Sequence, residues 1–473
     1  MYSRLTAAVL ILWAFAPNSW ALDPLEERAA LVLRKATEFY TSNVASHGGY
    51  VYHYALDLDR RWGEGEATKN QVWVQPPGTP TVGLAFIRAY EATGEQLYLD
   101  AATDAAMALV YGQLKSGGWT NVIDFDPKGQ RLSQYLRGGG KGKNNSSLDD
   151  GQTQSAILCL IRVDAAHKFR HKAIHDAARL SLDALLKAQF PNGGFPQVWT
   201  GPVKSRPIVK ASFPDYDWRT EGRIKNYWDM YTLNDNVTGY VAETLIAAYE
   251  IYGDQKYDQA LRRLGDFLIL AQLPEPQPGW AQQYNESMHP IWARRFEPPG
   301  VSGDETQEVL QTLMVIAHAT GENKYLEPIP SAVRWLKRSM LPDGKIARYY
   351  ELETNRPLYM KRRGDVYELT YDDSNLPSHY SWKTSSRLLK LREMYQRATA
   401  GQSPLSTRTR RQLTKQSEQI ISNLDPSGRW VSRFDGTRIV GQLKLPVGTP
   451  YLSSGVFSEN ITTLADFIAL GND

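Results

Sequence analysis

Gly117-Gly118-Trp119 and Gly193-Gly194-Phe195 are two copies of the short pattern that decides the fold of this 473-residue chain. A glycine pair or Pro-Gly followed by an aromatic residue also occurs at Gly48-Gly49-Tyr50 and Pro278-Gly279-Trp280, with weaker copies at Asp343-Gly344-Lys345 and Ser427-Gly428-Arg429-Trp430. Successive copies are separated by 65 to 85 residues. A nearly constant period of this kind predicts a repeat architecture.

Helical periodicity predicts a pair of helices in each interval. The pairs are Val82–Thr93 with Gln96–Gln113, Ser155–Ala166 with His175–Gln189, Thr238–Tyr252 with Tyr257–Gln272, Glu308–Thr320 with Tyr325–Met340, and Thr384–Arg397 with Arg408–Asn423. Glu26–Asn43 and Glu459–Leu470 lack neighbouring partners, so we expect these terminal helices to dock together. The sequence therefore predicts an all-α fold, an α/α toroid of about six helical hairpins with long loops forming a cleft at one end. A TPR-like stack is a weaker alternative, because its period is only about 34 residues.

Composition and the N-terminus set the class of protein. Arg4, the apolar run 5–17 and the small-x-small sequence Ser19-Trp20-Ala21 predict a signal peptide over residues 1–21. Residues 22–473 are then one catalytic domain of a secreted or periplasmic monomer without a membrane span. The net charge of +3 is too small to indicate nucleic-acid binding. The single cysteine, Cys159, lies in an apolar run and is expected to be buried.

Three long polar connections interrupt the helical pattern. Residues 124–147, 200–231 and 348–381 each carry several arginine or lysine residues. Loops this long inside a compact domain are usually functional or disordered. Any one of these loops is explained by a solvated surface, but basic residues in all three favour a polyanionic substrate. The 13 Trp and 26 Tyr residues fit either core packing or a sugar-binding cleft.

Acidic residues stand at the predicted starts of three inner helices. These starts are Leu148–Thr153, Leu233–Val237 and Ser302–Thr306. Asp and Ser are ordinary N-cap residues, and capping alone explains any one start. Asp149-Asp150 and Asn234-Asp235-Asn236 offer more acceptors than one cap requires. Because hard divalent cations take carboxylate and carbonyl oxygens, we expect a Ca²⁺ site assembled from two helix starts.

A further constellation is Trp292-Ala293-Arg294-Arg295-Phe296-Glu297-Pro298-Pro299, which precedes the helix start at Ser302. An arginine pair beside Glu297 is compatible with a salt-bridged loop. Because this segment is expected at the same end of the toroid as the acids, the arginine pair is also compatible with side chains that face substrate.

At these segments the sequence resembles the family 10 polysaccharide lyases, the helical pectate lyases. The similar segments cover about residues 105–385 and keep the family's order. They are Gly117–Trp119 with Ile123-Asp124, Leu148–Ile157, Gln189–Gln197, Leu233–Val237, Trp292–Pro299 and Thr354–Pro357. Each motif is weak alone, but the ordered set is fairly specific.

The resemblance implies a helical toroid that cleaves a uronic-acid polymer by β-elimination. It implies metal-binding positions for Asp149 and Asp235, the catalytic base for Arg294, and substrate contacts for Arg295, Arg356, Trp119 and Gln197. Calcium would neutralise the uronate carboxylate and so make the C5 proton easier to remove. An arginine acts as a base only where its pKa is lowered, because the free value exceeds about 12.

Departures from the family pattern concern substrate positions. Thr120-Asn121 stand where the family usually has Pro-Lys, His379 precedes Tyr380-Ser381-Trp382 without a basic pair, and Tyr284 aligns with a histidine. These differences are compatible with a substrate other than polygalacturonate, such as a different or methylated uronan. Two alternatives remain at this point: a toroidal glycoside hydrolase that uses two of the carboxylates of Asp149, Asp235 and Asp304, and a non-catalytic uronan-binding relative.

Overall fold

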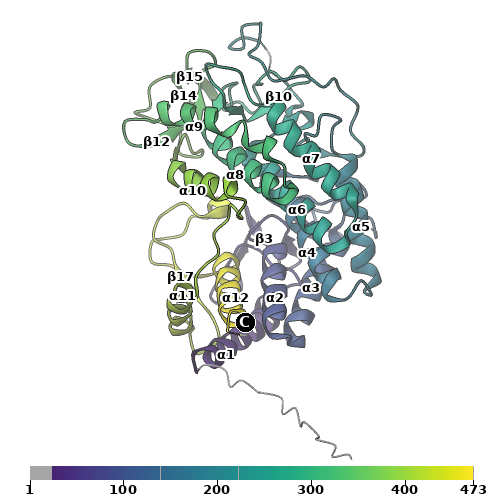
Figure 1. Cartoon of the computed structure of the whole chain (residues 1–473). Helices are drawn as coiled ribbons and strands as arrows, with labels where there is room; N and C mark the ends of the chain where they lie inside the picture. The colour runs from purple at the N-terminus through teal and green to yellow at the C-terminus, as the bar shows by residue number, and fades with distance from the viewer. Residues whose placement is uncertain (1–23, 139, 222, 472–473) are drawn as a thin grey trace, which may run out of the picture.

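The computed structural model describes residues 24–138, 140–221 and 223–471, so the predicted signal peptide lies outside the described residues. Helices dominate the molecule (Figure 1). They are α1 (Pro24–Phe39), α2 (Thr79–Thr93), α3 (Gln96–Gly112), α4 (Gln152–Ala166), α5 (Lys172–Lys187), α6 (Val237–Tyr252), α7 (Gln255–Leu270), α8 (Gly303–Thr320), α9 (Ile329–Arg338), α10 (Leu388–Thr399), α11 (Arg410–Ser422) and α12 (Ser454–Ala469). None of these helices is long and apolar enough to cross a membrane.

The helices form two curved layers. In the inner layer α12 packs on α2, α2 on α4, α4 on α6, α6 on α8, and α8 on α10. In the outer layer α3, α5 and α7 each pack on the inner helix that precedes them, and α1 and α11 pack on α12. The prediction that the two terminal segments dock together is therefore confirmed by the contact of α1 with α12. Four predicted hairpins are found, as α2 with α3, α4 with α5, α6 with α7, and α8 with α9. The predicted fifth hairpin, Thr384–Arg397 with Arg408–Asn423, is wrong, because α10 packs on α8 and α9 whereas α11 packs on α12 and α1.

The inner row is bridged by a loop between its two ends, α10 and α12. Leu405, in the connection between α10 and α11, lines a cavity together with side chains of α4, α6 and α8. Three residues later, Arg408 Nη1 donates to Thr463 Oγ1 of α12 over 2.9 Å. A loop, rather than packing of α10 along α12, therefore connects these two ends.

The glycine-aromatic pattern is a repeated tight turn at the end of each outer helix. Gly117 and Gly193 have φ of 96° and 94°, values that glycine adopts without strain. The turn closes when Leu114 N donates to Gly118 O over 2.9 Å. Phe190 N donates to Gly194 O over 2.8 Å in the same way. The first glycine of each pair is therefore required by the backbone of the turn, and the second by packing, because a Cβ atom there would clash with Ser146 or Phe267.

The aromatic residue of each turn ties it to the next inner helix. Trp119 N donates to Thr153 Oγ1 of α4, and Trp280 N donates to Thr306 Oγ1 of α8, both over 3.0 Å. The indole Nε1 of each of these tryptophans donates to a carbonyl of the outer helix just completed, over 2.8 Å. These two repeats thus each carry a strut from outer helix to turn to inner helix.

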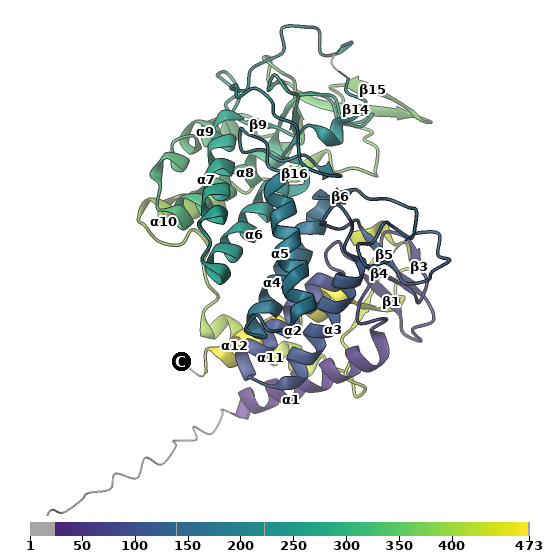
Figure 2. The ribbon, with the colours of Figure 1, turned by 90° about the vertical axis from the view of Figure 1, so that its right-hand side faces the viewer.

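Short strands accompany the turns, so the all-α expectation was incomplete. They are β1 (His53–Ala55), β2 (Arg61–Trp62), β3 (Glu66–Ala67), β4 (Gln71–Trp73), β5 (Val122–Asp124), β6 (Ser146–Ser147), β7 (Val198–Trp199), β8 (Tyr231–Thr232), β9 (Trp280–Ala281), β10 (Gln283–Tyr284), β11 (Val301–Ser302), β12 (Lys345–Ala347), β13 (Tyr349–Tyr350), β14 (Pro357–Arg363), β15 (Val366–Thr370), β16 (Lys383–Ser385), β17 (Val431–Arg433) and β18 (Pro450–Ser453). Pairs such as β6 with β7 and β8 with β10 join loops that are distant in sequence. Figure 2 shows β1, β3, β4, β5 and β6 together on one side of the helices.

Candidate active site

Two successive inner helices begin with the same backbone device. One-turn helices, η2 (Asp149–Gly151) and η4 (Asn234–Asn236), precede α4 and α6 and pack on each other. Within them Asp150 and Asp235 both have left-handed backbone angles, with φ of 46° and 52°. Left-handed conformations are costly for residues other than glycine and recur at functional sites. The two aspartates are therefore structural equivalents, and Asp149 is the equivalent of Asn234.

Glutamine side chains orient these acids. Gln197 Nε2 donates to Asp149 Oδ1 over 2.6 Å, and Gln75 Nε2 donates to Asp150 Oδ2 over 2.8 Å. Asn234 Nδ2 donates in the same way to Asp235 Oδ2. Each of the three carboxylates thus has one oxygen held by a side-chain amide, and the second oxygen of Asp235 lies 3.9 Å from Arg348 Nη2.

The carboxylates repel one another. Burial and the neighbouring charges of Asp149 and Glu64 raise the pKa of Asp150 to about 6. Burial and the charges of Asp150 and Asp149 raise the pKa of Asp235 well above its ordinary value. The region therefore carries negative charge that nearby arginines offset only in part.

Arg348 of the loop between β12 and β13 is the buried counterion of this acidic region. Its side chain is only 9% exposed, and its Nη2 lies 2.9 Å from Glu305 Oε1 and 3.9 Å from Asp235 Oδ1. Its Nη1 lies 3.5 Å from Asp304 Oδ2. A buried arginine that bridges several acids stays charged. The positive charge of Arg348 therefore partly offsets the other effects that raise the pKa of Asp235.

Arg294 faces the same acidic region from a tight turn. Its backbone N donates to Glu297 Oε2 over 3.0 Å, and its guanidinium Nη2 lies 2.5 Å from Glu297 Oε1. Although burial works in the opposite direction, the hydrogen bond and charge of Glu297 raise the pKa of Arg294 above its ordinary value. The charge of Asp235 also raises the pKa of Arg294. The charge of Arg294 in turn lowers the pKa of Asp150. Arg294 is thus a cation that interacts electrostatically with Asp150 and Asp235, and Asp149 acts on Asp235.

A cationic cleft of 570 Å³ adjoins Arg294. Its charged lining consists of Arg223, Lys225, Arg294 and Arg295, and no carboxylate lines it. The aromatic rings of Tyr227, Phe296 and Tyr367 complete the walls. Cations and flat rings in one concavity suit a polymer of charged pyranoses.

The remaining predicted site residues fall in three different surroundings. Arg295 lines the cationic cleft, where its Nη1 donates to Asp365 O over 3.3 Å. Gln197 is buried and bonds Asp149, so it positions an acid rather than lining the cleft. Arg356 is exposed and stacks on Tyr371, with its Cζ 3.6 Å from the ring centroid. No contact of the described residues links Arg356 to the acidic region.

The prediction that Trp119 contacts substrate is wrong. Its side chain is fully buried, and both of its nitrogens are used within the fold. A more exposed aromatic residue next to the cleft is Trp228, which is 39% exposed and follows cleft residue Tyr227 in the chain.

Sequence reasoning also missed the roles of Asp150 and Arg348. The parallel between Leu148-Asp149-Asp150 and Leu233-Asn234-Asp235 was a usable signal, because aligning the two starts pairs Asp150 with Asp235. Arg348 had no comparable signal, since its partners come from residues 43 and more positions away.

The donor chemistry of the acidic region suits calcium. Asp149, Asp150 and Asp235 supply carboxylate oxygens, and the raised pKa values of Asp150 and Asp235 reflect burial and a repulsion between carboxylates that a divalent cation relieves. Within the described residues no three His, Cys, Asp or Glu side chains form a ready-made metal cluster. The residues therefore fit calcium in charge and in donor type, as part of a coordination shell.

Comparisons with known proteins bear on the same region. Residues 113–346 match the model of the pectic acid lyase family. A mutant of the family 10 polysaccharide lyase from Cellvibrio cellulosa, in complex with trigalacturonic acid, aligns with 20% identity and a TM-score of 0.47, covering 62% of this chain and 92% of that one. A second structure of that Cellvibrio cellulosa lyase aligns with 19% identity and a TM-score of 0.48, over 66% and 95% of the two chains.

A third solved structure is of another class. Cellobiose 2-epimerase from Bacillus thermoamylovorans aligns with 13% identity and a TM-score of 0.48, over 93% of this chain and 98% of that one. The search of curated proteins found no match. The family match spans the turn at Trp119, both acidic helix starts and the Arg294 turn. The resemblance of this chain to the family 10 polysaccharide lyases is thereby confirmed over residues 113–346.

Proposed function

We propose that this protein is an exported enzyme that cleaves a uronic-acid polysaccharide by calcium-assisted β-elimination. The observation that carries the proposal is the cationic cleft with Arg223, Lys225, Arg294 and Arg295 beside an acidic region. The match of residues 113–346 to the pectic acid lyases supports the same reaction class. For the architecture we propose an α/α toroid, with the loop around Leu405 and Arg408 completing the ring.

In this reaction a base takes the proton from C5 of a uronate, and the electron pair of the broken C5–H bond forms the C4=C5 double bond. The C4–O bond breaks, and the departing oxygen takes up a proton. Asp149, Asp150 and Asp235 would hold calcium, which offsets the charge of the substrate carboxylate and stabilises the carbanion. The cleft arginines orient the substrate through its carboxylates.

We propose Arg294 as the group that meets the C5 proton. Glu297 opposes this role in the described arrangement, because it raises the pKa of Arg294. Proton abstraction by Arg294 therefore requires that a bound cation, which lowers the pKa of a neighbouring arginine, outweigh Glu297. Asp150, whose pKa is raised to about 6, is the competing candidate for the base.

The test is a screen of the purified protein on pectate, methylated pectin, alginate and glucuronan, with calcium or with a chelator. A lyase generates ultraviolet absorbance from its new C=C bond, and we expect chelation to remove that activity. New reducing ends without absorbance would instead establish a hydrolase, for which the raised pKa of Asp150 beside Asp149 would supply an acid. Binding of a uronan without shortening would establish a non-catalytic relative.

A further inference from the structure

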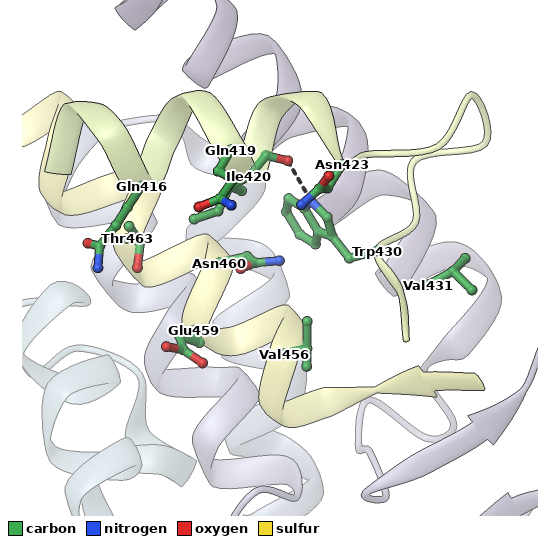
Figure 3. A pocket seen from close by; sticks show the side chains of 10 residues that line it. All are labelled: Gln416, Gln419, Ile420, Asn423, Trp430, Val431, Val456, Glu459, Asn460 and Thr463. Carbon is green, nitrogen blue, oxygen red and sulfur yellow. Dashed lines mark hydrogen bonds between the residues drawn. The ribbon is translucent and has the colours of Figure 1, made fainter. Parts of the chain in front are cut away.

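A polar groove lies between α11 and the first half of α12, outside the region that matches the lyase family. Its volume is 540 Å³. Figure 3 shows side chains of the two helices facing each other across it, with Trp430 at one end. The groove belongs to the C-terminal part of the chain, where no site has been assigned above.

Carboxamides dominate the walls of this groove. Gln416, Gln419 and Asn423 come from α11 and its C-terminal end, and Asn460 comes from α12 together with Glu459. Within the described part of the chain, none of these five side chains has a hydrogen-bond or ion-pair partner. No lysine or arginine lines the groove. Several free amide donors and acceptors therefore converge on one concavity.

Trp430 supplies a fixed apolar wall. Its Nε1 donates to Ile420 O over 2.9 Å, so the polar edge of the indole is already satisfied. The ring packs at 54° against Phe457 with centroids 6.1 Å apart, and 7% of the residue remains exposed. Val431 and Val456 extend this apolar wall. The groove therefore has one rigid apolar end and polar sides.

This chemistry differs from that of the cationic cleft. The cleft is lined by four cations and suits carboxylates, whereas the groove is lined by amides and one acid. Carboxamides both donate and accept, which matches sugar hydroxyls, while an indole edge and aliphatic carbons match sugar C–H groups. Glu459, as the only charged side chain of the lining, disfavours an anionic ligand.

We propose that the groove between α11 and α12 binds an uncharged oligosaccharide, as an accessory site separate from the cationic cleft. Substrate polymers that carry neutral sugars next to uronates would then contact both sites. The proposal does not depend on the reaction proposed above, because a protein without lyase activity would retain the groove.

The test is isothermal titration calorimetry with galacto-, arabino- and xylo-tetrasaccharides, and with trigalacturonate as the anionic comparison. We expect at least one neutral probe to bind, and Gln419→Ala and Asn460→Ala each to weaken it by about 5- to 10-fold. Gln402→Ala, which removes an exposed amide outside the groove, is the matched control and should leave the affinity unchanged. Arg294→Ala should also leave it unchanged.

Three results would overturn the proposal. These are binding of none of the neutral probes, neutral binding that survives both groove substitutions, and trigalacturonate affinity that falls in the groove variants but not in Arg294→Ala. If one variant loses its folded circular-dichroism spectrum, Asn423→Ala replaces it, because this exposed residue lies just beyond the end of α11.

Discussion

Asp150 and Asp235 occupy the same backbone position in two adjacent helix starts, each in a left-handed conformation. The residues before them, Asp149 and Asn234, also correspond. A glutamine amide donates to each of these preceding residues: Gln197 to Asp149, and Gln282 to Asn234. Because the second start carries a neutral residue there, charge at Asp149 is less essential than charge at Asp150.

We therefore expect Asp150→Asn and Asp235→Asn to weaken calcium activation by about 10- to 100-fold, and Asp149→Asn to weaken it by less than about 10-fold. Calcium titrations of the initial elimination rate measure all three. An equal loss in the three variants would contradict the equivalence of Asp150 with Asp235.

The raised pKa of Asp150 predicts a pH-dependent stability. In the unfolded chain the pKa of Asp150 is about 4, the ordinary value of an aspartate. In the folded protein its pKa is about 6, so Asp150 keeps its proton to higher pH. The folded state thus holds more protons between these values, and its stability falls as pH rises through this window. Without calcium, Asp150→Asn should raise the free energy of unfolding by about 1–2 kcal/mol at pH 7 and by little at pH 4. Urea unfolding at the two pH values in chelator is the measurement, and an equal gain at both would argue against this origin.

Glu297 controls the proton affinity of Arg294, so its replacement distinguishes the two candidate bases. If Arg294 accepts the C5 proton, Glu297→Gln should shift the alkaline rise of kcat/KM to lower pH, and Arg294→Ala should reduce kcat by about 1000-fold. If Asp150 is the base, activity should instead disappear in Asp150→Asn even at saturating calcium, and Glu297→Gln should leave the pH profile unchanged. Arg295→Ala is the control: it should mainly raise KM, since Arg295 only lines the cleft.

The cleft cations should determine the salt dependence of binding. Arg223→Gln and Lys225→Gln each remove one charge from the cleft, and we expect KM to rise about 3- to 10-fold with a weaker dependence on ionic strength. Lys390→Gln, an exposed residue of α10 outside the cleft, should change neither quantity. Steady-state kinetics in low and high salt provide the measurement.

Trp119 is part of a structural strut, so its substitution should affect stability rather than substrate affinity. Trp119→Phe removes the Nε1 hydrogen bond to Leu109 O and leaves a void, at a cost of about 1–3 kcal/mol in unfolding free energy. Trp228→Ala removes an exposed ring beside the cleft and should raise KM with little change in Tm. The reverse pattern in these two variants would restore Trp119 as a substrate contact.

The repeat could be predicted from the sequence because two local signals agreed. Helical periodicity located the hairpins, as in the match of predicted Thr238–Tyr252 to α6 (Val237–Tyr252), and the glycine pairs marked the turns. The short strands could not be predicted, because two or three residues such as Val198–Trp199 show no period and pair only through tertiary contact.

The sequence could indicate those candidate-site residues that belong to a local motif of neighbouring residues. Asp149, Asp235 and Arg294 come from local motifs; η2 and η4, which carry the two aspartates, pack on each other, and the charge of Asp235 acts on Arg294. Arg348 and Gln75 act through partners far along the chain, and the burial of Trp119 depends on bonds to Leu109 and Thr153. Such pairings are fixed by the packing of whole repeats, which one sequence does not display.

The bonds from Trp119 to Thr153 and from Trp280 to Thr306 fix the starts of α4 and α8. The end of one long loop takes part, because Gly118 N of the same turn donates to Ser146 Oγ over 2.8 Å. Exchange of the parts of the long loops that do not bond these turns or helix starts should leave the scaffold intact. Changes in these loops, whether by evolution or by loop grafting in the laboratory, could therefore alter which polymer is recognised while the helical scaffold is kept.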